Sequence, residues 1–371
     1  MNLKIALLPG DGIGPEVINE SVRVLDAIGE KFGIDFTYKT ADVGAIAIDK
    51  TGNPLPEETL RLCADSDAIL FGAIGDPKYD NNPTAKVRPE QGLLKLRKSL
   101  GLFANIRPLT TYDSLIHKSN IKEEIIKGTD FVIYRELTSG IYFGEKSISE
   151  DKTSATDVCT YTIEEIDRIT HLAFKAAQVR RKKLTLVDKA NVLETSRLWR
   201  KQVTEIAKSY PEVTLEFLFV DNAAMQLILE PTQFDVILTE NMFGDILSDE
   251  ASVISGSIGL LASASIGKHS ALFEPIHGSY PQAKGKNIAN PLAAILSAAM
   301  LLDHFNLKEE ADCIRVAVEK SIELSISTPD LNPTNHFSTI EVGEFIKNFI
   351  LDYEDPYYNR NNIDLGRSTI I

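Results

Sequence analysis

The 371-residue sequence has few cysteines, no long apolar run and no excess of basic residues, and each absence excludes a class of protein. Its three cysteines are odd in number and form no CxxC pair, so we expect neither a disulfide framework nor a zinc knuckle. Thiols without a pairing pattern fit a reducing compartment and favour a cytoplasmic location. No segment reaches the roughly 18 consecutive apolar residues of a membrane-spanning helix, and we expect no signal peptide at the N-terminus.

Basic residues are outnumbered, because 39 lysines and arginines stand against 53 aspartates and glutamates, a net charge of −14. A general nucleic-acid binder needs a basic surface, so this balance disfavours one. It leaves room for a local basic pocket that binds an acidic metabolite. The six histidines show no metal-ligand spacing, and neither a GxSxG elbow nor a GKS/GKT loop occurs, which disfavours hydrolases and P-loop NTPases.

The sequence does contain a regular alternation of short apolar runs and amphipathic segments. The length favours two domains, and the alternation predicts an α/β architecture with a largely parallel sheet. Strands are predicted at residues 3–8, 68–71, 130–136, 184–188, 214–220 and 235–239. Helices are predicted from about residue 15 and at about 57–65, 163–180, 195–208, 222–229, 291–305, 308–326 and 339–350. Segment 141–161, β-prone at 158–161, is predicted to form a protruding hairpin, and 353–371 receives no assignment.

A glycine-rich segment, GDGIGP at residues 10–15, follows the first predicted strand and precedes a helix. It resembles a dinucleotide-binding fingerprint, but the last glycine of GxGxxG would fall at Pro15. The acidic residue farther on, Asp35, does not end an apolar strand as that fold requires. We therefore interpret the segment as a turn that shapes the strand-to-helix junction.

Three arginines, Arg97, Arg107 and Arg135, are candidates for binding an acidic ligand. Guanidinium groups hold carboxylates by paired hydrogen bonds, so several of them together would suit a dicarboxylic substrate. Taken singly, each arginine is more often a surface or structural residue. Only convergence in the fold would make them a site.

Asp245 and Asp249 lie four residues apart after a predicted strand, which places both carboxylates on one face of a helix. Magnesium takes such oxygen ligands, with substrate and water completing its shell. Acidic residues in the first turn of a helix explain the spacing equally well. Asp221, predicted at the end of a strand, could complete the set, because ligands of open α/β sheets gather beyond the carboxyl ends of the strands.

Lys189 follows a predicted strand, and Tyr142 follows a turn at Gly140. Either side chain can move a proton if burial and neighbouring charges perturb its pKa. Taken alone, each is more often an ordinary residue.

Six segments together resemble the β-decarboxylating dehydrogenases, the family of isocitrate and isopropylmalate dehydrogenases, and its isopropylmalate branch in particular. They occur in the family's order and span most of the chain, which makes the series far more specific than any single motif. The segments are GDGIGPEV at 10–17, GLLKLRKSLGLFANIRP at 92–108, YRELTSGIYFGE at 134–145, DKANVLETSRLWR at 188–200, NMFGDILSDEASVISGSIGL at 241–260 and FEPIHGSYPQAKGKNIANP at 273–291.

The resemblance implies a two-domain, isocitrate/isopropylmalate dehydrogenase-like fold that differs from the Rossmann fold. Residues 1–102 and 256–371 would form a discontinuous first domain with the main part of the cofactor site. Residues 103–255 would form a second domain with the dimer interface, and 141–161 would be the arm that joins two subunits. The implied assembly is a homodimer with shared active sites, and neither nucleic acid nor a membrane is an implied partner.

The implied reaction is the oxidative decarboxylation of 3-isopropylmalate to 4-methyl-2-oxopentanoate with reduction of NAD, a step of leucine biosynthesis. In this family pattern, Arg97, Arg107 and Arg135 hold the malate carboxylates. Lys189, donated by the partner subunit, takes the proton from the hydroxyl at carbon 2, and Tyr142 protonates the enolate after carbon dioxide leaves.

The resemblance also implies a divalent metal, Mg²⁺ or Mn²⁺, bound by Asp245 and Asp249. Asp221 of the other subunit completes the metal and substrate site. Such an ion eases loss of the hydroxyl proton and stabilises the enolate.

Glu90, Leu93 and Leu94 precede Arg97 on a predicted helix and match the positions that face the branched alkyl group in isopropylmalate enzymes. Isocitrate enzymes carry a polar Ser/Asn pair in this region. Two leucines suit an isopropyl group better than a carboxylate. They could instead be ordinary core leucines.

The dinucleotide is expected against the 74–87 loop and segment 274–290. One matching position departs from the family, because Gln282 stands where NAD-dependent members usually have an aspartate that repels the 2′-phosphate of NADP. Lys284 and Lys286 nearby could attract that phosphate. NAD is the expected cofactor, and its selectivity over NADP stays open. The matched positions are Ile74, Gly75, Glu274, His277, Gly278, Ser279, Gln282, Ile288 and Asn290.

Three alternatives remain at this stage. A sister enzyme could act on isocitrate, homoisocitrate or tartrate, and the two leucines disfavour the first two. A non-catalytic regulatory subunit is disfavoured because the acid, base and metal positions are intact. A metabolite-binding protein without turnover is left to a test of NAD reduction.

Overall fold

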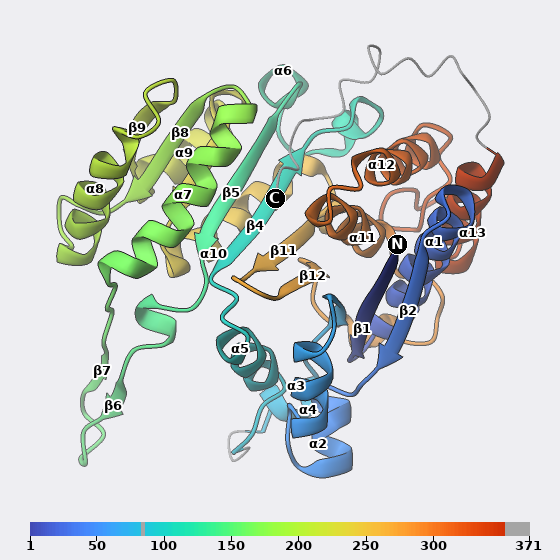
Figure 1. Cartoon of the computed structure of the whole chain (residues 1–371), viewed down its shortest axis with the longest axis horizontal. Coiled ribbons are helices and arrows are strands. Elements are labelled where there is room, and N and C mark those ends of the chain that lie inside the picture. The colour runs from blue at the N-terminus through green and yellow to red at the C-terminus, as the bar shows by residue number, and fades with distance from the viewer. Residues whose placement is uncertain (83–85, 353–371) are drawn as a thin grey trace. The chain divides into compact units, whose positions relative to one another are not determined.

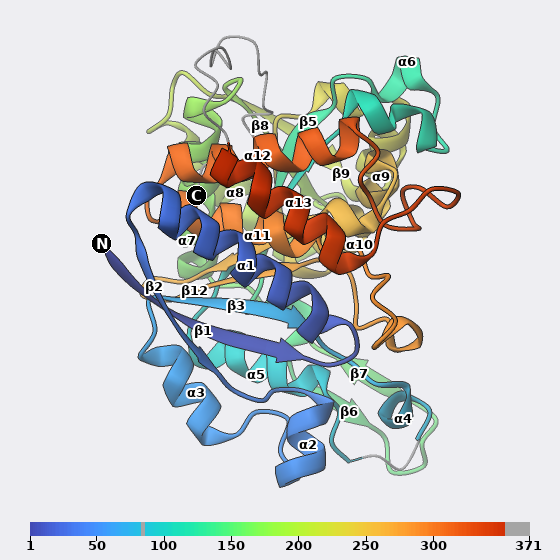
Figure 2. The ribbon, with the colours of Figure 1, turned by 90° about the vertical axis from the view of Figure 1, so that its right-hand side faces the viewer.

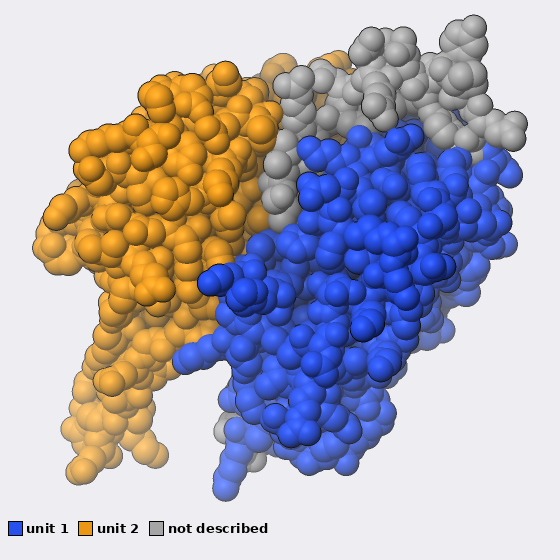
Figure 3. Space-filling model, viewed as in Figure 1, with its two compact units in different colours: residues 1–101, 257–366 blue, residues 102–256, 367–371 orange. Residues whose placement is uncertain are grey.

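The computed structural model describes residues 1–82 and 86–352, which pack into two compact units (Figure 3). Of these residues, 1–82, 86–101 and 257–352 form unit 1, and residues 102–256 form unit 2. The functional roles expected for the two halves, cofactor binding and dimerisation, stay predictions. The C-terminal segment 353–371, left unassigned from the sequence, lies outside the described residues.

Unit 1 contains five strands in the order β2-β1-β3-β12-β11. The pairs β1–β2, β1–β3 and β3–β12 are parallel, and β11 runs antiparallel to β12. The expected α/β class with a largely parallel sheet is therefore confirmed here. The strands are β1 (Asn2–Gly10), β2 (Asp35–Thr40), β3 (Ala68–Ala73), β11 (Ala262–Ile266) and β12 (Ala271–Pro275).

Helices α1 (Gly14–Phe32) and α11 (Leu292–His304) contact the strands of unit 1, and α12 (Lys308–Glu323) and α13 (Thr339–Asp352) pack against them (Figure 2). Nearly every side chain of α11 is buried, as its all-round apolar sequence predicts. Shorter helices complete the unit. They are α2 (Ala45–Thr51), α3 (Glu57–Ala64), α4 (Pro77–Asp80) and α5 (Glu90–Ser99).

The glycine-rich segment is a tight turn between β1 and α1, as predicted. Gly10 and Gly12 both have positive φ, and a Cβ on Gly12 would lie 1.9 Å from the carbonyl oxygen of Ser279. The Asp11 carboxylate accepts hydrogen bonds from the backbone amides of Ala45, Ile46 and Gly75. The turn thus fixes the backbone at Gly75 and Ser279, two of the candidate cofactor positions.

Unit 2 has five strands in the order β4-β5-β10-β8-β9, antiparallel between β4 and β5 and parallel elsewhere. Helices α7 and α8 pack together on one face, and α9 and α10 pack together on the other (Figure 1). The strands are β4 (Ala104–Thr110), β5 (Asp130–Glu136), β8 (Lys183–Asp188), β9 (Thr214–Phe219) and β10 (Val236–Thr239). The helices are α6 (Glu123–Ile126), α7 (Ile163–Val179), α8 (Glu194–Ala207), α9 (Val220–Leu229) and α10 (Asn241–Ser252).

The predicted hairpin in 141–161 is present as the antiparallel pair β6 (Lys146–Ile148) and β7 (Ala155–Asp157), whose side chains are all exposed (Figure 1). The ladder of this hairpin ends at Asp157, before the β-prone residues 158–161. Beyond it, the Tyr161 ring is buried in edge-on contact with Trp199, and the Tyr161 hydroxyl accepts a hydrogen bond from Asn241 N–H. Because Tyr161 packs against the core of unit 2, the residues that lead to it do not extend the hairpin.

Within residues 1–82 and 86–352, every helix is too short or too polar to cross a bilayer.

Candidate active site

Asp245 and Asp249 lie on successive turns of α10, the helix that begins directly after β10. The first turn of α10 carries no acidic residue, so the pair is not the helix-start feature that the spacing alone allowed. The side chain of Asp249 is 68% exposed and that of Asp245 is 33% exposed. Both carboxylates are therefore accessible to a hard cation, and their oxygens suit magnesium or manganese.

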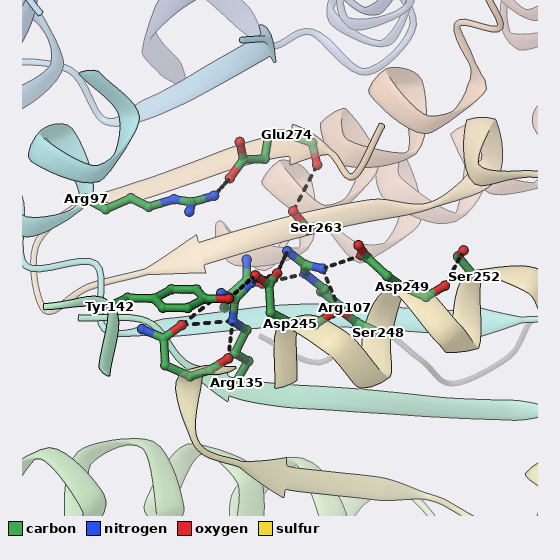
Figure 4. Close-up of polar contacts among 12 residues, drawn as sticks. Arg97, Arg107, Arg135, Tyr142, Asp245, Ser248, Asp249, Ser252, Ser263 and Glu274 are labelled. Atoms are coloured by element: carbon green, nitrogen blue, oxygen red, sulfur yellow. Dashed lines mark hydrogen bonds and ion pairs between the residues drawn. The ribbon is translucent and has the colours of Figure 1, made fainter. Parts of the chain in front are cut away.

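Arg107 from β4 and Arg135 from β5 converge on these carboxylates (Figure 4). Arg135 donates to Oδ1 of Asp245 at 2.5 Å, while Arg107 lies 3.7 Å from Asp245 and 3.4 Å from Asp249. Both guanidinium groups are almost buried. The convergence that a carboxylate-binding site requires thus holds for these two arginines.

Two asparagines, which sequence reasoning missed, hold the arginines in place. The side-chain oxygen of Asn241 accepts bonds from Nε and Nη2 of Arg135 at 3.1 and 2.8 Å. Asn105, two residues before Arg107 on the same strand, accepts from its Nε at 2.7 Å. The i, i+2 spacing of Asn105 and Arg107 on a strand was the available signal.

Tyr142 ends a 3-10 turn, Gly140–Tyr142, and joins the same cluster. Its hydroxyl donates a 2.8 Å hydrogen bond to Oδ2 of Asp245, and the guanidinium of Arg135 lies 5.8 Å from its ring centroid. Burial raises the pKa of the Tyr142 phenol, and the hydrogen bond to Asp245 raises it further. The phenol therefore keeps its proton at neutral pH, as a proton donor must.

The turn that leads to Tyr142 is wrapped around Glu136, which is fully buried next to Arg135 in the chain. Its carboxylate accepts hydrogen bonds from the amides of Thr138 and Ser139 and from the Thr138 hydroxyl. Arg168 completes the group at 3.2 Å. Glu136 was not predicted from the sequence as part of the site. It follows Arg135 on β5, so its side chain points to the opposite face of the sheet.

Lys189 follows β8 and forms an ion pair with Asp221, with Nζ 2.5 Å from Oδ1. The prediction that Asp221 ends a strand is wrong: β9 ends at Phe219, and Asp221 lies in the first turn of α9, where helix dipoles favour carboxylates. The hydrogen bond from Lys189 lowers the pKa of Asp221. Among the described residues, no three metal-ligating side chains gather, so Asp221 does not join the pair on α10 within one chain.

In unit 1, Arg97 on α5 forms a buried ion pair with Glu274 on β12, at 2.7 Å (Figure 4). The Nε of Arg97 is also buried and has no hydrogen-bond partner within the described chain. Nε of Arg97 is thus a donor that the described residues leave unsatisfied.

The leucines of α5 differ in exposure. Leu94 is 36% exposed and Leu93 is half-buried, whereas Leu96 is fully buried and belongs to the core. The core-leucine interpretation is therefore wrong for Leu94. At the start of the same helix, Oε1 of Glu90 lies 3.0 Å from the place that a Cβ on Gly75 would occupy.

The candidate cofactor segment presents one unsatisfied buried atom, Nε2 of His277, which has no partner within the described chain. Burial lowers the pKa of His277, so the ring is neutral at pH 7. Asn290 is buried and donates to Asp330 at 3.0 Å, and Ile288 packs on the apolar cluster that includes Ile13. A nucleotide would supply the partner that His277 lacks.

Gln282 lies in the 3-10 turn Pro281–Ala283 and is exposed, as are Lys284 and Lys286. Gly278 also has open space where a Cβ would be, and Ile74 is half-buried. Residues 83–85 of the expected 74–87 loop lie outside the described residues.

Residues 4–346 match the sequence model of the isocitrate/isopropylmalate dehydrogenase family. The 3-isopropylmalate dehydrogenase of Bacteroides fragilis is 57% identical over 94% of this chain and 99% of its own. That of Geobacillus kaustophilus is 54% identical over 95% of this chain and 96% of its own.

Two solved structures have folds similar to that of this chain. Isocitrate dehydrogenase from Methylococcus capsulatus has a TM-score of 0.85 and 35% identity, covering 94% of this chain and 99% of its own. A β-decarboxylating dehydrogenase from Thermococcus kodakarensis has a TM-score of 0.78 and 38% identity, covering 94% and 96%. The expected isocitrate/isopropylmalate dehydrogenase-like fold is thereby confirmed.

Proposed function

The chain belongs to the isocitrate/isopropylmalate dehydrogenase family, and from this premise we propose that it converts 3-isopropylmalate to 4-methyl-2-oxopentanoate and carbon dioxide while reducing NAD. The reaction would serve leucine biosynthesis. The observation that carries the proposal is identity above half with 3-isopropylmalate dehydrogenases along almost the whole of both chains.

The substrate would be recognised by charge at one end and by apolar contact at the other. Arg97, Arg107 and Arg135 would bind the carboxylates, and the two arginines of unit 2 already face acidic groups. Leu93 and the exposed Leu94 would contact the isopropyl group, and Glu90 would lie nearby. Binding of an alkyl group would explain why the side chain of Leu94 is exposed.

Two side chains would move protons. Lys189 would take the proton of the hydroxyl at carbon 2. Loss of this proton would favour departure of the hydride from the same carbon. After the β-carboxylate leaves as carbon dioxide, Tyr142 would donate its proton to the enolate carbon. The raised pKa of Tyr142 supports this role, because a donor must be protonated before the step.

Asp245 and Asp249 would hold Mg²⁺ or Mn²⁺, with Asp221 of the partner subunit as a third carboxylate. Two carboxylates on adjacent helical turns fit a magnesium ion, which keeps water and substrate in its shell. When bound, the ion would polarise the hydroxyl and the adjacent carboxylate and stabilise negative charge on the enolate.

NAD would bind along Ile74, Gly75 and segment 274–290. The partnerless Nε2 of His277 and the open space at Gly278 fit a bound nucleotide. Gln282 would lie at the adenosine ribose, where its lack of charge weakens discrimination against NADP. The remaining positions are Glu274, Ser279, Ile288 and Asn290.

We further propose a homodimer in which Lys189 and Asp221 serve the partner's active site. Their ion pair does not join the carboxylates of α10 in the same chain. Met225 and Leu229 on α9 and Ile246 on α10 are each more than half exposed, and the two helices pack together. Exposed apolar side chains on adjoining helices favour an interface, and the exposed β6–β7 hairpin would be the arm.

Unpaired Cys63, Cys159 and Cys313 favour a cytoplasmic location.

The substrate assignment is tested by a panel of 3-isopropylmalate, isocitrate and malate with NAD or NADP and Mg²⁺, followed by absorbance at the reduced cofactor. We expect 3-isopropylmalate with NAD to give the highest specificity constant. Leu94→Ser should lower that constant by about tenfold, since a lost alkyl contact costs this order of magnitude. Leu324→Ser, a change at another exposed leucine, should leave it unchanged. Preference of the parent for isocitrate would overturn the assignment.

Shared sites are tested by mixing two inactive variants. A dimer of one Lys189→Ala chain and one Tyr142→Phe chain would contain one intact site if the lysine crosses between subunits. Random exchange should restore roughly one quarter of the parental activity. No recovery after verified subunit exchange would place all residues of each site in one chain.

A further inference from the structure

Glu240 is a buried carboxyl that the proposed chemistry does not use. It links β10 to α10 and is 6% exposed. Although it occupies the residue before the helix, its side chain makes no capping bond to α10. A carboxyl group kept out of water without serving as a helix cap requires another role.

The Glu240 side chain contacts the segment that carries Lys189. The hydroxyl of Ser196, in the first turn of α8, donates to Oε1 of Glu240 at 3.0 Å. The Ser196 oxygen in turn accepts a hydrogen bond from the backbone amide of Lys189 at 3.1 Å. Ser196 is fully buried, so water does not compete for either bond.

Lys189 is held from a second side by its own turn. Amides of Val192 and Leu193 donate to the Lys189 carbonyl. The backbone of Lys189 is thus defined at its amide by Ser196 and at its carbonyl by the following turn. Of these contacts, only the one through Ser196 depends on an ionisable group.

Resting on the proposed function, we propose that Glu240 is a positioning residue for the proton acceptor, acting through Ser196 to fix the backbone, and hence the side-chain nitrogen, of Lys189. The three residues belong to one hydrogen-bonded chain that joins α10, α8 and the end of β8. A displaced base lowers turnover without weakening the arginines that bind substrate.

The charge of Glu240 changes near neutral pH. Burial raises its pKa, the Ser196 hydrogen bond opposes this rise and the negative charge of Asp188 adds to it, and together they bring the pKa to about 7. Asp188 itself is paired with Arg200 through two bonds of 2.8 Å, and among the described residues Cys159 and Tyr161 also interact electrostatically with Glu240. A carboxylate accepts the Ser196 hydrogen bond more strongly than a neutral acid does. The backbone of Lys189 should therefore be held more firmly through Ser196 as the pH rises through 7.

The test compares Glu240→Gln with the parent in steady-state turnover of 3-isopropylmalate with NAD and Mg²⁺ between pH 5.5 and 9. Glutamine keeps the shape and stays uncharged. The parent-to-variant ratio of kcat should rise about 10-fold across this range with a midpoint near pH 7, while KM for substrate changes little. A ratio that is flat with pH would overturn the proposal.

Ser196→Ala gives an independent variant that removes only one hydroxyl. It should reproduce the loss of kcat, and the double variant should be no worse than either single one, because the two residues act as a unit. Additive losses would contradict the hydrogen-bonded chain. Glu205→Gln, an exposed acid on the same helix that pairs with Lys208, is the matched control and should behave as the parent.

Amide exchange separates this inference from the proposed function. Deuterium uptake of the peptide that contains Lys189 needs no substrate, and both variants should exchange faster there than the parent at pH 8. If the parent turns over no 3-isopropylmalate but this uptake difference appears, the proposed function fails while the positioning contact stands. Equal uptake in parent and variants would overturn the contact.

Discussion

The hydroxyl of Tyr142 donates a hydrogen bond to Oδ2 of Asp245, which joins the proposed proton donor to a proposed metal ligand. The other oxygen of Asp245 accepts from Arg135. One carboxylate therefore contacts both the residue proposed to protonate the enolate and a residue proposed to bind the substrate. Changes at Asp245 should affect metal affinity and the behaviour of Tyr142 together.

Asp245→Asn should raise the Mg²⁺ concentration needed for half-maximal activity. An amide can still coordinate through oxygen, but it brings no negative charge to a hard cation and leaves Arg135 without its ionic partner. The measurement is a metal titration of activity with parent and variant. Superimposable titrations would remove Asp245 from the ligand set.

Tyr142→Phe should separate the two chemical stages, because hydride transfer needs no phenol and enolate protonation does. We expect rapid-quench analysis to show slower formation of the final keto acid, by about 10²–10⁴-fold for loss of an acid. Tyr38→Phe is a matched control, since Tyr38 also donates to a carboxylate, that of Asp26, at 2.9 Å. The Tyr142 assignment fails if both stages keep their parental rates.

Lys189→Ala should lower turnover by about 10²–10⁴-fold while substrate still binds, since the proton acceptor is lost and the arginines remain. Titration calorimetry of the variant with substrate and Mg²⁺ measures whether substrate still binds. Lys208→Ala changes an exposed lysine of unit 2 and should have no effect. Turnover near the parental value would exclude Lys189 from the chemistry.

Gln282→Asp should increase the preference for NAD over NADP, chiefly by weakening NADP. A carboxylate at the ribose repels the 2′-phosphate and can accept hydrogen bonds from the ribose hydroxyls. Bonds to charged groups are worth roughly 1.5–3 kcal/mol when buried, and the exposure of Gln282 places the effect at or below the lower end. The ratio of specificity constants for the two cofactors at one salt concentration is the readout. An unchanged ratio means that Gln282 does not face the ribose.

Glu240→Gln should also change how stability depends on pH. The pKa of Glu240 is raised from 4.5 to about 7, so the folded chain retains a proton that the unfolded chain loses between these values. Parent stability relative to the variant should therefore be highest below pH 4.5, fall as pH rises to about 7, and stay level above, by at most about 3 kcal/mol. Denaturant unfolding across this range measures it. A constant difference would show that Glu240 titrates normally.

The sequence predicted correctly those features that depend only on residues close together in the chain. The turn at residues 10–15 and the helical spacing of Asp245 and Asp249 depend on neighbouring residues, and both are present. The strands β2, β4, β11 and β12 were missed; β2 is a short edge strand with little buried surface, and β4 contains Pro108, a residue that disfavours strands. Their register depends on partners elsewhere in the chain.

The supporting contacts of the site were beyond the sequence for the same reason. Arg107 meets Asp249, 142 residues away, and Ser196 meets Glu240, 44 residues away. Nothing local to either residue signals its partner. Family resemblance identified the residues expected to touch substrate, whereas Asn241, Glu136 and Glu240 emerge only from the packed structure.

The stoichiometry of the reaction tests the central claim most directly. Purified protein with 3-isopropylmalate, NAD and Mg²⁺ should yield NADH, carbon dioxide and 4-methyl-2-oxopentanoate in equal molar amounts, quantified in one reaction by absorbance, trapping and chromatography. Formation of NADH without carbon dioxide, or no NADH at all from this substrate, would contradict an oxidative decarboxylation of 3-isopropylmalate by this chain.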